Sequence, residues 1–100
     1  MVTYKAMYKF LEDGWVHAEV LDFPGVITCD GNLQLTRAAL ASALAEMAEI
    51  LAGEGEPLPI PNPHLSHIDA DIEEPIYLLI QAANQVTTIA EPVTSRNGVI

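Results

Sequence analysis

Two segments of alternating apolar and polar residues, joined by a short turn, are the feature that most restricts how the start of this chain can fold. In residues 3–11, alternate positions are apolar and share one face of an extended chain, and residues 15–21 show the same alternation. The Glu-Asp-Gly sequence of residues 12–14 lies between them, and Gly14 can adopt the positive φ angle of a tight turn. The pattern therefore predicts two antiparallel strands that form a β-hairpin.

A short strand and a long helix are predicted after the hairpin. The Asp-Phe-Pro-Gly sequence of residues 22–25 interrupts pairing, because proline lacks a ladder donor and glycine permits a tight reversal. Residues 26–29 then form a third strand. Asn32 is a good helix N-cap, large apolar residues recur at helical spacing over residues 33–51, and Gly53 is the expected C′ residue.

The second half of the chain is predicted to hold one further strand. Five of the seven prolines lie in residues 54–75, which favours an irregular, extended connection. Residues 76–80 are a continuous apolar run, as expected for a buried strand. The sequence thus predicts an α+β domain over residues 1–81, with a three-stranded antiparallel sheet, one helix packed across it and a fourth strand. Residues 82–100 are weakly patterned and are expected to form a tail without regular structure.

Acidic residues outnumber basic ones, with 14 Asp and Glu against 4 Lys and Arg and a formal net charge of −10. This balance counts against direct binding of nucleic acid and of anionic membranes, because both require clustered cations. It favours a basic protein as partner. Residues 1–81 hold 13 acidic and 3 basic residues, whereas residues 82–100 hold one of each.

A single cysteine, Cys29, excludes an intrachain disulfide and suits a reducing compartment. We expect its thiol to be a small buried hydrophobe on the third strand rather than a nucleophile.

No apolar run is long enough to span a bilayer, and the first residues do not have the pattern of a signal peptide. The sequence therefore predicts a soluble, cytoplasmic protein.

Three short motifs give the chain a family resemblance. The turn at residues 12–14, the Asp-Phe-Pro-Gly sequence at 22–25 and the Gly-Glu-Pro-Leu-Pro sequence at 55–59 occur in an order and spacing that resembles the HicB family of bacterial type II antitoxins. The resemblance covers residues 3–81. It implies a partial ribonuclease H-like fold of order β-β-β-α-β. It also implies a role in binding and neutralising a small, basic RNA-cleaving toxin, usually encoded beside the antitoxin.

The chain departs from this family pattern after the fourth strand. Many family members carry a C-terminal helix-turn-helix or ribbon-helix-helix module that binds DNA, but residues 82–100 contain Arg96 as their only cation and no two-helix periodicity. We therefore expect no DNA-binding module here. Family members are commonly oligomeric, and we expect a homo-oligomer, a dimer or higher. The alternative function is a stand-alone oligomeric interaction module that has lost its toxin, built through the strand at 76–80 and the tail.

Acidic residues and one tryptophan are the candidates for partner recognition. Trp15 lies on the strand face opposite Val16, and aromatic residues are enriched in binding hot spots, although a simple half-buried tryptophan fits equally well. Between Arg37 and Arg96 there are nine acidic residues and no Lys or Arg, which indicates either a solvated face or a surface for a cationic partner. The residues expected to contribute are Glu12, Asp13, Trp15, Glu54, Glu56, Asp69, Asp71, Glu73 and Glu74.

Enzymatic activity and metal binding have little support in the sequence. A nuclease needs several carboxylates that converge on divalent metal, and only Glu19 and Asp22 lie on or after the second strand. We therefore expect no catalytic residue and no cofactor.

A group of potential zinc or nickel ligands lies in the proline-rich connection, where nothing obvious fixes their geometry, so a solvated polar loop is expected instead. These residues are His64, His67, Asp69 and Asp71.

Overall fold

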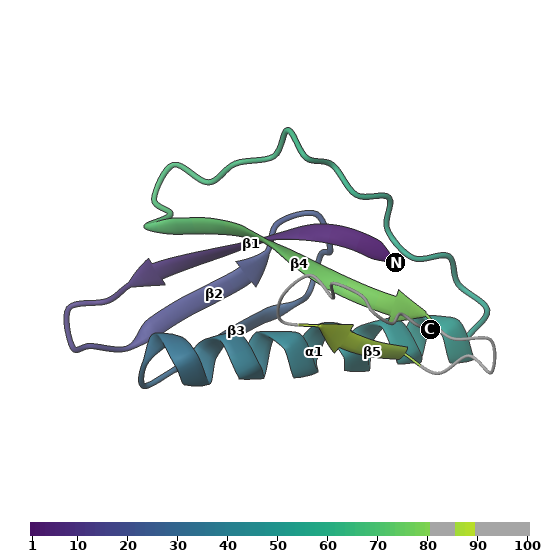
Figure 1. The fold of residues 1–100 in the computed structure, drawn as a ribbon, viewed down its shortest axis with the longest axis horizontal. Coiled ribbons are helices and arrows are strands. Elements are labelled where there is room, and N and C mark those ends of the chain that lie inside the picture. Colours follow the sequence, from purple (N-terminus) through teal and green to yellow (C-terminus); the bar gives the residue numbers. More distant parts are fainter. Residues whose placement is uncertain (81–85, 90–100) are drawn as a thin grey trace, which may run out of the picture.

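The computed structural model describes residues 1–80 and 86–89, which form an antiparallel sheet with one helix packed along one face (Figure 1). The strand order in the sheet is β3-β2-β1-β4-β5, and each neighbouring pair is antiparallel. The predicted α+β layout, with three strands, a helix and then a strand, is present. The elements in chain order are β1 (Val2–Phe10), β2 (Val16–Val20), β3 (Ile27–Asp30), α1 (Leu33–Gly53), β4 (Ile72–Ile80) and β5 (Val86–Ile89).

The predicted hairpin is formed by β1 and β2, with Phe10 opposite Val16 at its closed end. Gly14 has a φ angle of +92°, the left-handed conformation that the turn requires and that only glycine adopts without strain. The alternate side chains of the two strands that face the helix are buried, apart from Val2 and Phe10 at the two ends of β1. These residues are Tyr4, Ala6, Tyr8, Val16, Ala18 and Val20.

The helix covers this face with a stripe of buried residues, Thr36, Leu40, Leu44 and Ala48. Its start is confirmed, because the side-chain oxygen of Asn32 accepts a hydrogen bond of 2.8 Å from the N–H of Leu35. Within the described residues, no helix is both long and apolar enough to cross a membrane.

The end of the helix differs from the prediction. Gly53 is still helical, and Gly55, with a φ angle of +74°, is the C′ residue instead. The N–H of Gly55 donates to the carbonyl of Ala52 at 3.2 Å, and the N–H of Glu56 donates to that of Leu51 at 2.9 Å. This pair of bonds is a Schellman motif, which satisfies two carbonyls that the helix leaves without partners.

The fourth strand begins earlier than predicted. Residues 54–75 are expected to be irregular and residues 76–80 to form the strand, but β4 covers Ile72–Ile80. The expectation fails because Pro75 is a poor strand residue only where its missing N–H would be needed.

The register explains why Pro75 is tolerated inside β4. It lies opposite Lys5 of β1. The N–H of Lys5 donates to Asp22 Oδ1 at 2.9 Å and its carbonyl accepts from the N–H of Leu21 at 2.8 Å, both on the β2 side. Lys5 and Pro75 are therefore a non-hydrogen-bonded pair of the β1–β4 ladder, and proline removes no bond there.

A fifth strand lies in the segment where no regular structure was expected. Val86–Ile89 pairs with β4, with Ile80 opposite Val86. The sequence Val-Thr-Thr-Ile is β-branched throughout, which favours strand, but it is too short to show a convincing periodicity. Residues 82–85 and 90–100, and with them the expected absence of a DNA-binding module, lie outside the described residues.

The expected burial of Cys29 is wrong, because its side chain is exposed. Cys29 lies opposite His17 on β3, which is an edge strand of the sheet. Its side chain belongs to the sheet face that the helix does not cover. Ile27, two residues earlier on the same face, is 57% exposed.

Candidate partner-binding surface

The residues predicted to bind a partner lie in three places. Glu12, Asp13 and Trp15 are in the turn of the β1–β2 hairpin, Asp69, Asp71, Glu73 and Glu74 are in or just before β4, and Glu54 and Glu56 follow the end of α1. The hairpin turn and the start of β4 lie at one end of the sheet, on the left in Figure 1, and the end of α1 lies at the other. The nine residues therefore do not form one surface.

Backbone contacts bring the turn before β4 to the end of β1. The N–H of Phe10 donates to Asp71 Oδ2 at 2.7 Å. The N–H of Asp71 in turn donates to the carbonyl of Tyr8 at 2.8 Å. We call the exposed residues gathered here the hairpin end, and they are Phe10, Leu11, Glu12, Asp13, Trp15, Ile68, Asp69 and Asp71.

Large apolar side chains are exposed at the hairpin end. Trp15 is 46% exposed, Phe10 50% and Ile68 97%. The Asp13 carboxylate accepts a hydrogen bond of 3.0 Å from the N–H of Trp15, and the carbonyl of Trp15 accepts one of 2.8 Å from the N–H of Leu11. These two hydrogen bonds fix the backbone of Trp15 in the turn. Grouped apolar exposure with polar surroundings is typical of protein-binding sites.

The hairpin end is also negatively charged. In the part of the chain that the structure describes, the ion pairs are Lys5 with Glu73, His17 with Glu19 and Arg37 with Glu74. None of them involves the four acidic residues of the hairpin end, so within residues 1–80 and 86–89 no cation pairs with these carboxylates, although Lys9 is adjacent to Phe10 in β1. Four acidic residues near one lysine leave a net negative charge, which attracts a cationic partner.

Glu74 is engaged on the helix side of the sheet. Its carboxylate accepts two hydrogen bonds from Arg37 of α1, from Nε at 2.9 Å and from Nη2 at 2.8 Å. The guanidinium carbon of Arg37 lies 5.6 Å from the centre of the Tyr8 ring. Burial, and secondly the charge of Glu74, raise the pKa of Tyr8 above its ordinary value. This cluster joins the helix to the sheet.

Glu73 is engaged on the opposite side. Its Oε2 atom accepts hydrogen bonds from Ser66 Oγ at 2.8 Å and from the N–H of His67 at 3.0 Å, and its Oε1 atom lies 3.6 Å from Nζ of Lys5. The His67 N–H first, then the Ser66 hydroxyl and the Lys5 charge, lower the pKa of Glu73. A role of Glu73 and Glu74 in recognition stays a prediction, but both carboxylates already hold the fold together.

Asp22 has a role that its sequence position did not reveal. Its side chain is 6% exposed, and its two carboxylate oxygens accept from the N–H of Lys5 and the N–H of Asn62, each at 2.9 Å. Asp22 therefore ties β1 to the connection that precedes β4. The second carboxylate considered for chemistry, Glu19, is bonded to His17 Nε2 at 2.8 Å. An acidic residue directly before a Phe-Pro-Gly turn is the sequence signal that could have suggested such a tie.

Two of the potential metal ligands of the connection, His67 and Asp71, accept hydrogen bonds from backbone N–H groups. His67 Nδ1 accepts from the N–H of Asp69 at 3.1 Å, and Asp71 binds the backbone of Phe10. Across residues 1–80 and 86–89, no group of three or more His, Cys, Asp or Glu side chains is arranged to hold a metal ion.

Neither a scan against protein-family models nor a search of curated proteins gives a significant match to this chain. The family resemblance therefore rests on the three motifs at residues 12–14, 22–25 and 55–59. In the structure, these segments form the hairpin turn, the turn that carries Asp22, and the end of the helix.

Proposed function

We propose that this chain is a HicB-like antitoxin domain, without enzymatic activity of its own, that binds and neutralises a small, basic RNA-cleaving toxin. The observation that carries the proposal is the hairpin end, where an exposed tryptophan lies among acidic side chains that pair with no cation of the described residues. The hairpin end is the surface that we assign to toxin binding.

Charge complementarity supports this assignment. A protein that cleaves RNA needs a cationic surface for the phosphate backbone. An acidic surface on the antitoxin matches that surface, speeds association and competes with RNA for it. Trp15 supplies a large, partly apolar side chain of the type that dominates binding energy at protein interfaces.

The architecture is compatible with the family plan. The order of three strands, a helix across the sheet and then β4 supports a partial ribonuclease H-like fold. Each motif behind the resemblance also has a structural task, since Gly14 and Gly55 adopt positive φ angles and Asp22 accepts two backbone hydrogen bonds. These tasks explain why a fold of this kind needs those residues at that spacing.

The remaining properties follow from the same proposal. A toxin that cleaves cellular RNA acts in the cytoplasm, so its antitoxin is placed there too. The net charge of −10 supports a protein partner over nucleic acid or membrane. Homo-oligomers are the usual state of such antitoxins, and we propose a dimer or higher.

The strand at 76–80 is not the free edge that the stand-alone oligomeric interaction module was expected to use, because β4 is paired with both β1 and β5. One observation at another edge favours this second function. The edge strand β3 carries Ile27, which is 57% exposed, and the exposed thiol of Cys29. Exposed edges of this kind pair readily with other chains. Light scattering on the chain alone, with Ile27→Lys as the variant, tests assembly through β3: loss of the oligomer on substitution supports it, and an unchanged mass removes the support for this module.

Co-expression with the product of each adjacent gene tests the antitoxin proposal. We expect a small, lysine-rich neighbour to form a complex that weakens as the salt concentration rises, and its toxicity to be suppressed by this chain. If no adjacent gene product binds in low salt, the antitoxin proposal is wrong.

A further inference from the structure

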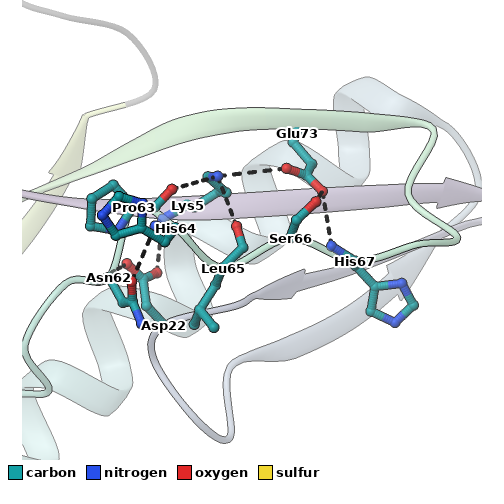
Figure 2. A network of polar contacts seen from close by, with 9 residues as sticks. All are labelled: Lys5, Asp22, Asn62, Pro63, His64, Leu65, Ser66, His67 and Glu73. Carbon is teal, nitrogen blue, oxygen red and sulfur yellow. Dashed lines mark hydrogen bonds and ion pairs between the residues drawn. The ribbon is translucent and has the colours of Figure 1, made fainter.

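A nine-residue segment of the connection lies on the sheet face opposite the helix. This segment, residues 59–67, is called the strap. It runs along β1 and β4 while α1 covers the other face (Figures 1 and 2). The helix runs in the same direction as β4, so the chain must travel back along the sheet before β4 can begin.

Polar contacts fasten the strap at four points. The hydroxyl of Tyr4 donates to the carbonyl of Pro59 at 2.7 Å, and Asp22 accepts from the N–H of Asn62 at 2.9 Å. Further along, Lys5 binds strap carbonyls and Glu73 binds the Ser66 hydroxyl and the His67 N–H. All four fastening side chains come from outside the strap.

Lys5 is central to this arrangement, as Figure 2 shows. Its ammonium group donates to the carbonyl of Pro63 at 2.9 Å and to that of Leu65 at 2.8 Å, and it lies 3.6 Å from Glu73 Oε1. The two carbonyls take two of the three N–H donors of the ammonium group, and Glu73 is its ion-pair partner. One side chain thus links two strap residues to β1 and β4.

The strap itself is largely exposed to solvent, although Met7 of β1, on the sheet face that the strap covers, is 0% exposed. Six of the nine strap residues are exposed, including Ile60 at 87%. A cavity of about 320 Å³ lies beside it, lined by Pro63 of the strap and by Lys5, Asp22 and Pro75, among others. Segments with little buried apolar surface and solvent-exposed hydrogen bonds open at low free energy compared with the core.

We propose that the strap is a releasable element, which detaches from the sheet while the sheet and helix stay folded, and that Lys5 is the residue that fastens it. The strap leads directly into Ile68 and Asp69 of the hairpin end. Its release therefore alters the surface assigned to toxin binding. That last consequence rests on the proposed function, whereas the release itself does not.

Amide hydrogen exchange, measured by NMR on the chain alone, tests the release. We expect the amides of Asn62 and His67 to be protected at least about 100-fold less than those of Ala6 and Met7 in β1. Lys5→Met should lower the protection of the strap amides by about a further tenfold, and the protection of β1 amides that exchange only on global unfolding should fall by no more than the same factor, because both openings break the bonds of Lys5.

Arg37→Met is the matched control, because it removes the cation that pairs with Glu74 on the helix side. It should leave the protection of the strap amides unchanged. The proposal is overturned if the strap amides of the wild-type chain are as protected as those of β1. It is equally overturned if Lys5→Met leaves the strap amides as protected as they are in the wild-type chain. No toxin is needed, so a failure here is separate from a failure of the proposed function.

Discussion

Glu73 and Glu74 are consecutive residues whose carboxylates lie on opposite faces of the sheet. Glu74 is bound by Arg37 of α1, at 2.8 and 2.9 Å, and Glu73 lies 3.6 Å from Lys5 of β1. Successive side chains of a strand alternate between faces, so an acidic pair in the sequence is not an acidic patch in the fold. Both residues join elements of the domain, and the acids left for a partner are concentrated elsewhere, at the hairpin end.

Asp22→Ala should lower the free energy of unfolding by about 2–3 kcal/mol, because the part-buried N–H groups of Lys5 and Asn62 lose a charged acceptor. Urea denaturation measures this change. Glu46→Ala removes an exposed acid of α1 and should change stability by less than about 0.5 kcal/mol. Equal unfolding midpoints for the two variants would show that Asp22 is not a structural tie.

The two glycines at the end of α1 should respond oppositely to alanine. Gly53 is helical, and Gly53→Ala should stabilise the domain by about 0.5–1 kcal/mol. Gly55 has a φ angle of +74°, and Gly55→Ala should destabilise it by about 1–2 kcal/mol. An added Cβ meets no atom within 4 Å at either position, so the backbone alone decides the difference. Thermal unfolding measures the stability of both variants. Stability changes of the same sign in Gly53→Ala and Gly55→Ala would contradict the observed helix end.

The strap should loosen in acid as Glu73 becomes protonated. Its pKa is lowered from 4.5, by the His67 N–H first and then by Ser66 and Lys5. A lowered pKa in the folded state means that the contribution is complete above the ordinary pKa and is lost as the pH falls through the lowered value. Protection of the His67 amide, corrected for intrinsic exchange, should therefore fall only below pH 4.5.

Glu73→Gln provides the control for this titration. The variant should show weak protection of the His67 amide at every pH, with no acid transition of its own. An acid transition that persists in Glu73→Gln would contradict the assignment of the pH dependence to Glu73.

Local signals explain which elements could be predicted from the sequence. The hairpin depends on alternation and on Gly14, and the start of the helix depends on Asn32, and each of these acts within a few residues. The start of β4 depends instead on the register of β1 and β4, which decides whether a hydrogen bond is needed at the position where Pro75 has no N–H. The exposure of Cys29 likewise depends on β3 being an edge strand.

The candidate site could be predicted only in part, for the same reason. Trp15 and its acidic neighbours in the turn were identified because they are adjacent in sequence. That Asp71 lies beside them follows from its bond to the N–H of Phe10, 61 residues earlier. The engagement of Glu73 and Glu74 by Lys5 and Arg37 also needs the three-dimensional structure.

Binding of the co-purified toxin by isothermal titration tests the central claim most directly. The variants are Trp15→Ala and Glu12→Lys at the hairpin end, with Glu46→Lys on the exposed side of α1 as a control of equal charge change. We expect Trp15→Ala to raise Kd about 30-fold or more, Glu12→Lys to raise it about tenfold, and Glu46→Lys to leave it near the wild-type value. Wild-type affinity in both hairpin-end variants, or equal weakening by Glu46→Lys, would contradict the assignment of toxin binding to the hairpin end.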